Sequence, residues 1–524
     1  MNPHFFFYPT FYLYILFLVY GLYYLIFRIT GFFSSINDFI ALFILNPSPL
    51  HIISRSISAA SGILSIYLLY LLSKKLYSKE AGLVSSLILS LTYLHAKDSH
   101  FGTTDVPLTF LILLSYLFIS DILLSGKNYI LAGLLSGLSA SIKYNGSILA
   151  IAILTAHLLH KKDSEKNLRK KIFDKNIFLS AIAMILSFIL TSPYVVLDNK
   201  AFLKSIKFIT KAVGRGIGMN LDIGWLFYLK FTLRYGIGIP FLLISIIGII
   251  YLIYSHRKED ILVLSFPLAY FIFIGNSYGV FSRYMIPLLP FLALFAGIVI
   301  NKFISSLKFL RNYIPEVPIL ISLIILIPSI YNLINFSKIL SMEDTRNLAA
   351  NWVKKNIPSG SRIYIHGHEE YEIPPLPIDS ENIKKELEFF NEFKWKDREM
   401  ILRIQGINSL IKKKVLPLQP NFHIIRGESE YINDDILIKL SPDYIITTEY
   451  YLEYYSSDAK KLDNFLKNFC TPLKSFYPYN RAFKKPNPIF DPLDAFYVPY
   501  AKPDGIIRPG PVIHVYKVII NLNS

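Results

Sequence analysis

The amino-acid sequence predicts an α-helical polytopic membrane protein with a C-terminal extracytoplasmic mixed α/β domain. Of its 524 residues, 53% are hydrophobic and only 17% are charged, and the mean hydropathy is +0.42. Soluble globular domains carry about 25% charged residues, so much of this chain is expected to lie in lipid. The charge is also uneven: residues 1–340 hold 29 basic and 13 acidic residues, a net +16, whereas residues 341–524 hold 25 and 24.

This charge distribution bears on the partners of the chain. A nucleic-acid-binding protein carries its basic surplus on a soluble part. Here the surplus lies in the apolar part, where it suits anionic headgroups or a phosphate-bearing lipid. The lipid bilayer is therefore an expected partner and nucleic acid is not. The single cysteine, Cys470, excludes an intrachain disulfide framework and a cysteine metal cluster.

Apolar stretches and basic clusters together predict the topology. A helix needs about 20 apolar residues to cross a bilayer core. The candidate stretches are His51–Leu72, Ala81–Leu94, Val106–Leu124, Gly146–His160, Ile177–Leu197, Leu226–Tyr254, Ile261–Ile274, Arg283–Ile300 and Val317–Phe336. Basic residues favour the cytoplasmic side, and the clusters that include Lys74, Lys161–Lys171, Arg257 and Lys302 can all lie inside. The stretch at residues 97–105 and the tail from Ser341 are then expected at the extracytoplasmic face of the cell membrane.

Two apolar segments do not fit a simple crossing. Tyr129–Ile142 spans only 14 residues, too few for a bilayer core, and is predicted to be a half-helix that rises to Lys143. Broken helices at membrane depth occur where they line a protein or water cavity. Phe5–Phe27 is rich in Tyr and Phe and is expected to lie in the interface or to re-enter.

The chain is expected to form two domains, a membrane domain over residues 1–340 and a soluble α/β domain over residues 341–524. In the second, Asp344–Asn356 has helical spacing, and Pro358, Ser359 and Gly360 follow it. Short segments rich in β-branched and aromatic residues predict strands. These are Arg362–His366, Tyr444–Thr448 and Val512–Val518, and an ordered loop is expected over Tyr477–Pro511.

Polar residues at the outer mouth of two apolar helices form the first candidate site. Asp98, His100 and Asp105 follow one another closely there, together with Lys97. Ionisable groups beside the membrane are energetically costly and usually functional. Two carboxylates could act as general base and hold a divalent cation, with His100 as a further ligand. The alternative is that Asp105 only caps the helix that begins with Val106 and Pro107.

Two basic positions suit the phosphate of a lipid carrier. Lys143, at the tip of the half-helix, could meet a phosphate as a point charge, or it could extend its side chain to the interface. Arg283 and its neighbour Tyr284 stand at the head of a late helix. An arginine there could bind phosphate oxygens in a fork, or it could anchor the helix at the interface.

Two further groups are weaker candidates. Lys204, Lys207, Lys211 and Arg215 are spaced three and four residues apart, on one helical face. That face could hold an anionic lipid head or could simply be solvated. His366–Glu370 contains two histidines and two glutamates but no third spaced ligand, so a metal is not expected there.

Four segments of the chain resemble one family. They are Asn2–Pro9, Asp98–Pro107, Ser141–Gly146 and Arg283–Pro290. This set resembles the type C membrane glycosyltransferases related to the protein O-mannosyltransferases and the aminoarabinose transferase of lipid A. The resemblance is closest to the prokaryotic dolichyl-phosphate-mannose-transferase-like branch.

The resemblance implies a hexosyltransferase that moves a mannose-like sugar from a polyprenyl- or dolichyl-phosphate carrier to a protein, lipid or glycan acceptor. The transfer would be inverting and extracytoplasmic. By position, Asp105 matches a family acidic residue, and Lys143 and Arg283 match family basic positions, while Asp98 and His100 match the branch motif. We therefore take Asp105 and Asp98 as catalytic candidates. Lys143, Arg283, Tyr284 and His100 are the candidates for the donor phosphate.

The chain departs from the family at its start. Family members carry a first helix and an Asp-Glu pair before the segment that matches Asn2–Pro9, and this sequence begins at that segment. The family's general base is thus expected to be missing from it. Two other functions remain open: a lipid-linked sugar transporter or flippase, and an inactive scaffold for surface-glycan assembly. Whether a divalent cation takes part is not decided by the sequence.

Overall fold

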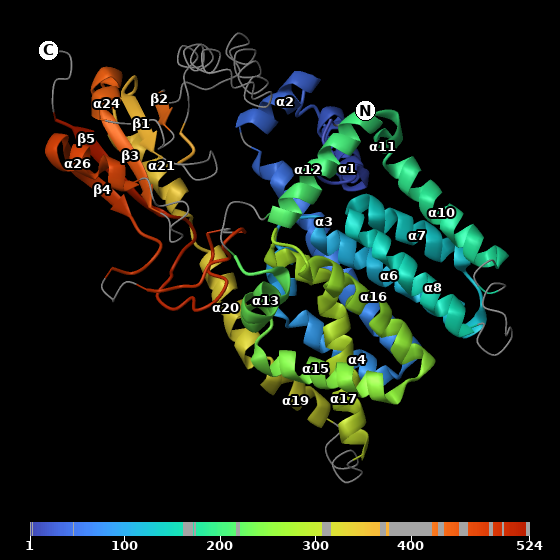
Figure 1. The fold of residues 1–524 in the computed structure, drawn as a ribbon. Coiled ribbons are helices and arrows are strands. Elements are labelled where there is room, and N and C mark those ends of the chain that lie inside the picture. The colour runs from blue at the N-terminus through green and yellow to red at the C-terminus, as the bar shows by residue number, and fades with distance from the viewer. Residues whose placement is uncertain are drawn as a thin grey trace. The chain divides into compact units, whose positions relative to one another are not determined.

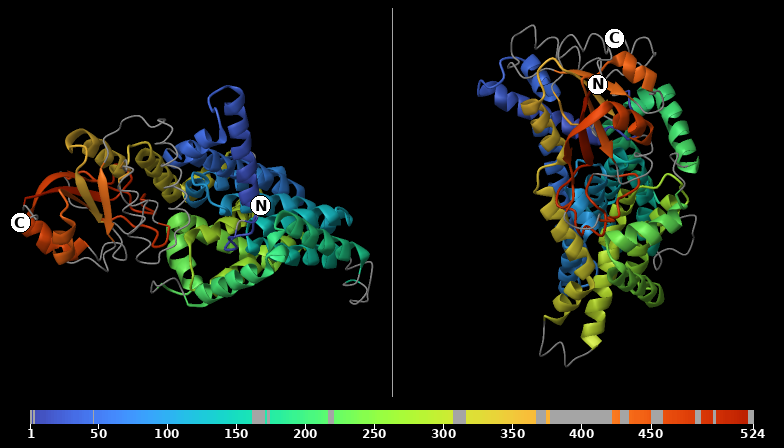
Figure 2. Two further views of the ribbon diagram at one scale, coloured as in Figure 1. Left: turned by 90° about the horizontal axis from the view of Figure 1, so that it is seen from above. Right: turned by 90° about the vertical axis from the view of Figure 1, so that its left-hand side faces the viewer.

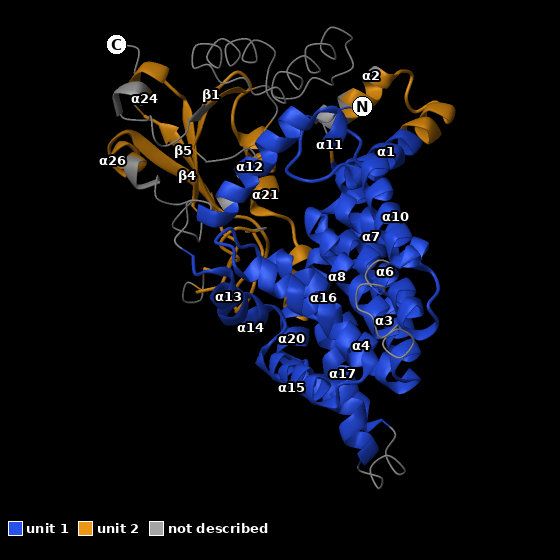
Figure 3. Cartoon of the chain, turned by 45° about the vertical axis from the view of Figure 1, so that its right-hand side comes forward, with its two compact units in different colours: residues 1–23, 48–333 blue, residues 24–47, 334–524 orange. Residues whose placement is uncertain are grey.

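The computed structural model describes most of the chain. The described residues are 2, 4–45, 47–160, 171, 174–215, 221–306, 316–366, 374–376, 422–427, 434–449, 459–481, 486–494 and 497–519. They divide into two compact units, residues 1–23 with 48–333 and residues 24–47 with 334–524 (Figure 3). The regular elements described in the first unit are helices, and the second unit contains a β-sheet.

Unit 1 is a bundle of mostly apolar helices (Figures 1 and 2). Its elements are α1 (Phe11–Ile29), α3 (Ser48–Leu76), α4 (Lys79–Ser90), α5 (Tyr93–Ser99), α6 (Asp105–Ser125), α7 (Tyr129–Ile142), η1 (Tyr144–Ile148), α8 (Leu149–His160), α10 (Lys175–Thr191), α11 (Tyr194–Leu197), α12 (Asn199–Arg215), α13 (Gly224–Phe227), η2 (Tyr228–Leu233), α14 (Arg234–Gly236), α15 (Ile239–Ser255), α16 (Lys258–Gly275), η3 (Ser282–Leu288), α17 (Leu289–Ser306), α19 (Val317–Ile325) and α20 (Ile327–Leu340). Both α1 and α20 run across the boundary between the units.

Several of these helices have the length and composition of membrane spans. Among the described residues, α1, α3, α6 and the run formed by η3 and α17 are long and apolar enough to cross, and α19 with α20 would be a fifth if this bent pair forms one span. Shorter apolar helices include α7, α10 and α15. The predicted fold class, a polytopic helical protein with a mixed α/β region near its C-terminus, is confirmed.

Several of the predicted helical segments differ from the structure. Ala81–Leu94 breaks between α4 and α5, Ile177–Leu197 between α10 and α11, and Val317–Phe336 between α19 and α20. Phe5–Phe27 is expected to lie in the interface or to re-enter, but α1 is one continuous apolar helix of 19 residues, so a crossing helix suits it better. Leu226–Tyr254 is expected as one helix, and that prediction is wrong, because the chain breaks between α14 and α15. Gly238 lies at the break with φ +87°, a conformation that glycine adopts at little energetic cost.

The half-helix predicted over Tyr129–Ile142 is α7, with the same bounds. It packs closely along α10 (Figure 1). Gly133 and Gly137 lie at this contact, and a Cβ atom on either would overlap the backbone carbonyl of Ser180 or Met184. Small residues spaced four apart allow two helix backbones to approach within a membrane. This close packing holds α7 in place although it is short.

Unit 2 contains a five-stranded mixed sheet. Its strands are β1 (Arg362–His366), β2 (His423–Gly427), β3 (Tyr444–Glu449), β4 (Cys470–Phe476) and β5 (Val512–Val518), and its described helices are α2 (Ile36–Leu45), α21 (Thr345–Asn356), α24 (Asp434–Leu440) and α26 (Ala459–Phe469). The strand order is β2-β1-β3-β5-β4. Strands β2, β1 and β3 run parallel, and β5 is antiparallel to both β3 and β4.

Each face of this sheet has its own core. On one face, Ala349 and Val353 of α21 pack with Ile363 and Ile365 of β1. On the other, Tyr364 packs in a cluster with residues of α24 and α26. Successive side chains of a strand alternate between faces, which explains why β1 contributes to both cores. The predicted helix and the three predicted strands are confirmed, whereas β2 and β4 are found only in the structure.

Candidate active site

The N-terminal end of α6 carries the carboxylate around which the candidate site forms. Asp105 is the first residue of α6, and Thr104 before it is the N-cap, whose side chain makes no capping hydrogen bond. The Asp105 side chain is buried, and its Oδ1 accepts a hydrogen bond of 2.6 Å from Lys143 Nζ. The carboxylate therefore takes part in an ion pair across the bundle instead of capping its own helix.

Lys143 stands where the chain leaves α7. Its backbone is extended, with φ −152° and ψ 135°, between the end of α7 and the start of η1. Its side chain is 7% exposed. Besides Asp105, the ammonium faces two aromatic rings, with Nζ 3.9 Å from the ring centroid of Tyr284 and 5.9 Å from that of Tyr8. A cation is attracted to such ring faces, so three side chains hold the Lys143 ammonium away from bulk water.

The third charged member comes from η3. Arg283 Nε lies 3.7 Å from Asp105 Oδ2, and the Arg283 guanidinium stacks 4.5 Å above the ring of Phe281. The backbone carbonyl of the next residue, Tyr284, accepts a hydrogen bond of 3.0 Å from the hydroxyl of Tyr270 in α16. This contact ties η3 to the bundle and sets the position of Arg283.

Two cationic side chains and one carboxylate meet in this cluster. Lys143 and Arg283 are cations and Asp105 is the carboxylate between them. Asp105 Oδ2 is buried and has no hydrogen-bond partner among the described residues. Lysine and arginine side chains bind phosphate oxygens through charge-assisted hydrogen bonds. The electrostatics of this cluster therefore suit a phosphate.

A divalent cation suits the same cluster poorly. Its one carboxylate, Asp105, already contacts two cationic side chains, and a metal ion bound there would be repelled by both. Mg²⁺ and Ca²⁺ prefer several oxygen ligands. Among the described residues, no group of three or more acidic, histidine or cysteine side chains is placed to hold a metal.

The helix α5 holds the other predicted site residues. Asp98 is buried, and its Oδ2 lies 3.8 Å from Nζ of Lys97, which is also buried. His100 is exposed at the C-terminal end of α5, with its Nδ1 2.8 Å from the backbone oxygen of Ala96. The structure thus brings Asp105, Lys143, Arg283 and Tyr284 together. It places Asp98 in a second ion pair and His100 at the surface.

Three side chains near these charges are not predicted as site residues. The ring of Tyr8 faces Lys143, the hydroxyl of Tyr270 supports η3, and His95 is buried in α5 with its Nε2 lacking a partner among the described residues. Tyr8 lies in one of the four segments that carry the family resemblance. Tyr270 lies within an apolar helix, where no sequence signal separates a functional tyrosine from a packing one.

The basic helix lies beside the candidate site. Residues 199–215 form α12, as the spacing of its basic residues predicts, and Lys204, Lys207, Lys211 and Arg215 are all exposed. The ring of Phe202, in the same helix, lies 6.2 Å from the ring of Tyr144, which follows Lys143 in the chain. The predicted histidine and glutamate cluster is different: apart from His366, its members lie outside the described residues.

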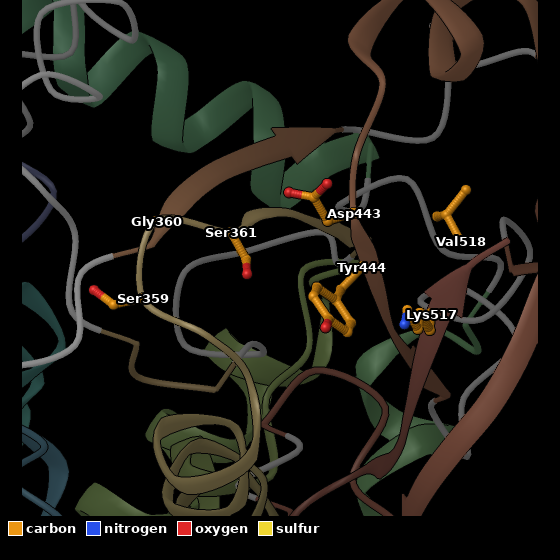
Figure 4. A pocket seen from close by; sticks show the side chains of 7 residues that line it. All are labelled: Ser359, Gly360, Ser361, Asp443, Tyr444, Lys517 and Val518. Carbon is orange, nitrogen blue, oxygen red and sulfur yellow. The ribbon is translucent and has the colours of Figure 1, made fainter. Parts of the chain in front are cut away.

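A shallow hollow of about 380 Å³ lies in unit 2 (Figure 4). Its lining is polar and comes from three segments of the chain. The residues are Ser359, Gly360, Ser361, Asp443, Tyr444, Lys517 and Val518. It lies where β1 and β3 begin, and ligands of parallel sheets bind at the opposite, carboxyl ends of the strands. Asp443 Oδ2 already accepts a hydrogen bond of 2.7 Å from the amide of Arg362, so this hollow is not the candidate site.

Comparisons with known proteins support the resemblance. Residues 41–196 match the family model described as dolichyl-phosphate-mannose-protein mannosyltransferase. A comparison with curated protein sequences finds no match.

Three solved structures are similar to the chain. ArnT from Cupriavidus metallidurans bound to undecaprenyl phosphate is 11% identical with a TM-score of 0.48, over 93% of this chain and 88% of that chain. ArnT in the apo state is 12% identical with a TM-score of 0.44, over 75% and 78%. The apo oligosaccharyltransferase of Archaeoglobus fulgidus is 12% identical with a TM-score of 0.49, over 98% and 81%. Through residues 41–196, which include Asp105 and Lys143, the chain matches the dolichyl-phosphate-mannose-protein mannosyltransferase family, and its predicted resemblance to the type C membrane glycosyltransferases is confirmed.

Proposed function

We propose that this protein is a membrane glycosyltransferase. It transfers a mannose-like hexose from a polyprenyl- or dolichyl-phosphate carrier to a protein, lipid or glycan acceptor on the extracytoplasmic face, with inversion at the anomeric carbon. One observation carries the proposal: the cations Lys143 and Arg283 converge on the buried carboxylate of Asp105. The family match over residues 41–196 supports the same reaction class.

The charge of the cluster changes in step with the proposed reaction. A sugar linked to a lipid phosphate is a phosphodiester with one negative charge, which the cations Lys143 and Arg283 attract. When the bond between C1 of the sugar and the phosphate oxygen breaks, its electron pair stays on the phosphate. The leaving lipid phosphate then carries a second negative charge. Lys143 and Arg283 stabilise that developing charge, and interactions that strengthen towards the transition state accelerate a reaction.

Asp105 acts in this proposal at the phosphate side of the sugar. It contacts both cations and so holds them where the phosphate binds. An inverting displacement brings the acceptor oxygen to C1 from the face opposite the phosphate. The acceptor's proton therefore goes to a base on that other face. Asp98, the second predicted carboxylate, remains the candidate from this chain for that role.

The surroundings of the cluster suit the lipid part of the donor. The exposed basic side chains of α12 would lie near headgroup phosphates, which agrees with an amphipathic helix in the interface. The rings of Tyr8 and Tyr284 contribute aromatic surface beside the Lys143 ammonium. In this proposal the site lies at the extracytoplasmic face, and so does the domain expected over residues 341–524.

The proposal is tested by donor turnover in reconstituted membranes. Purified protein is incubated with dolichyl-phosphate hexoses that are radiolabelled in the sugar, and the release of sugar from lipid is measured. We expect Lys143→Ala and Asp105→Asn to abolish release. The matched control is Lys230→Ala, because Lys230 also pairs with an aspartate, Asp222, but both side chains are exposed. Equal turnover in all three variants would overturn the site, and translocation of intact donor without release would indicate a transporter.

A further inference from the structure

A hydrogen-bonded chain of three side chains crosses neighbouring strands of unit 2. The hydroxyl of Ser475 in β4 lies 2.7 Å from Nδ1 of His514 in β5. On the other side of the ring, His514 Nε2 lies 3.1 Å from Oε1 of Glu449 in β3. With the carboxylate accepting from Nε2–H, Nδ1 accepts from the Ser475 hydroxyl. The imidazole is therefore held in one orientation by both neighbours.

These side chains share one face of the sheet. His514 is paired in register with Thr447 of β3 and with Ser475 of β4, and residues directly opposite in a sheet project to the same side. Tyr364 and Ile445 form part of an apolar core on this face, with α24 and α26. Further along the strands the same face becomes polar. Packing of the apolar core does not by itself require polar side chains at this end of the strands.

Aromatic rings surround the imidazole. The ring of Tyr477 lies edge-on to His514 at a centroid distance of 5.9 Å, and Tyr516 lies at 6.1 Å on the same strand as the histidine. Tyr479 is 5.5 Å from Tyr477. The guanidinium of Arg481 stands 4.6 Å over the ring of Tyr477. A carboxylate, an imidazole, a hydroxyl, a guanidinium and three phenols thus gather in one place.

The position of this cluster in the sheet favours ligand binding. Glu449 ends β3, Ser475 is the residue before the end of β4, and His514 lies near the start of the antiparallel β5. All three are therefore at the edge where the parallel strands have their carboxyl ends. Ligands of open α/β sheets bind at that edge. The side chains of Glu449 and His514 are 47% and 16% exposed, so a ligand can reach them.

We propose that this cluster is a carbohydrate-binding site for a hexopyranose unit. A sugar ring offers a CH face that packs on an aromatic ring, and several hydroxyls that bond to carboxylate, imidazole and guanidinium groups. The cluster presents both kinds of surface within one patch: Tyr477 for the ring, and Glu449 and Arg481 for the hydroxyls. His514 is bonded through both of its ring nitrogens and orients Glu449. This site goes beyond the proposed transferase function, because it needs neither the donor phosphate nor Asp105.

The test uses the full-length protein in nanodiscs. Methyl α-D-mannopyranoside and methyl α-D-glucopyranoside are titrated, and binding is followed by saturation transfer from protein to ligand protons. We expect a dissociation constant of about 1 mM for at least one sugar, equivalent to about −4 kcal/mol. Glu449→Gln and Tyr477→Ala should each weaken binding at least about tenfold. Tyr477→Phe, which keeps the ring, should bind nearly as the parent does.

The control is Lys517→Ala, which alters an exposed residue at the opposite end of β5 and should leave sugar binding unchanged. Glu449 is partly exposed, so its variant reports on the site even if Tyr477→Ala fails to fold. No binding of either sugar at about 20 mM, or equal binding by the Glu449→Gln and Lys517→Ala variants, would overturn the proposal. Donor turnover on the same preparations reports separately on the site at Asp105.

Discussion

The ion pair between Asp105 and Lys143 predicts opposite effects of two substitutions on the response to a lipid phosphate. Both side chains are buried and their charged atoms are 2.6 Å apart. Breaking such a pair by removing one partner destabilises a protein by about 3–5 kcal/mol, because the other charge remains buried without compensation. We therefore expect Asp105→Asn and Lys143→Met each to lower the thermal stability of the purified protein.

The two variants differ in the charge that remains. Asp105→Asn removes one negative charge and leaves both cations, Lys143 and Arg283, in place. A dolichyl phosphate then binds a more positive site, and it should stabilise this variant more than the parent. Lys143→Met removes a proposed phosphate contact, so its stabilisation by the same lipid should be smaller. A ligand at 100 times its Kd stabilises by about 2.7 kcal/mol, which is large enough to resolve these differences.

The assay is thermal unfolding in detergent, with and without saturating dolichyl phosphate, at one fixed scan rate because membrane proteins often unfold irreversibly. The double variant Asp105→Asn/Lys143→Met closes the cycle. The double variant should lose less stability than the two single variants lose together, and the difference should be about 0.5–3 kcal/mol for residues in contact. Strictly additive losses would refute the ion pair. If the lipid stabilised Asp105→Asn less than the parent, the assignment of the cluster to phosphate would be wrong.

Three further predictions follow from single contacts. Tyr284→Leu should raise the Kd for the donor about 2–30-fold, because the ring 3.9 Å from the Lys143 ammonium contributes about 0.5–2 kcal/mol. Tyr284→Phe keeps the ring and should leave the Kd unchanged. An equal loss of affinity in both variants, measured by titration calorimetry, would implicate the hydroxyl instead. Gly137→Ala should destabilise the protein by about 1–3 kcal/mol, because the added methyl group overlaps the carbonyl of a residue in α10. Gly21 has nothing within 4 Å of an added Cβ, so Gly21→Ala should not change the stability measured by thermal unfolding. Burial raises the pKa of the Cys470 thiol to about 11, so little reactive thiolate exists at pH 8 and alkylation should be slow until unit 2 unfolds; rapid labelling of the folded protein, seen by mass spectrometry, would contradict this.

The Cys470 thiol also predicts a dependence of stability on pH. Its pKa in the folded protein lies above the ordinary value of 9.0, so the folded state holds the proton more tightly than the unfolded state. That contribution to stability is complete below about pH 9 and is lost as the pH rises towards 11. Replacement by serine should flatten this part of the pH profile of unfolding.

Features that depend on local pattern could be predicted from the sequence. The apolar stretches predicted a polytopic helical protein because length and hydropathy alone decide whether a helix can lie in lipid. The starts of α7 and of the strands Arg362–His366 and Val512–Val518 were readable because turn-forming residues precede them, namely Gly126 and Asn128, Gly360, and Pro511. Family-like segments also singled out Asp105, Lys143 and Arg283 as separate candidates.

Which of these residues lie together depends on how the helices pack. Asp105 meets Lys143 from 38 positions away and meets Arg283 from a later helix, because packing of α6 against α7 and η3 sets their distances. No local pattern in the sequence encodes that packing. Strand β4 was not predicted from the sequence for a related reason. It contains Pro472 and exposed residues, and it is a strand only because β5 offers it hydrogen bonds, which brings Ser475 to His514.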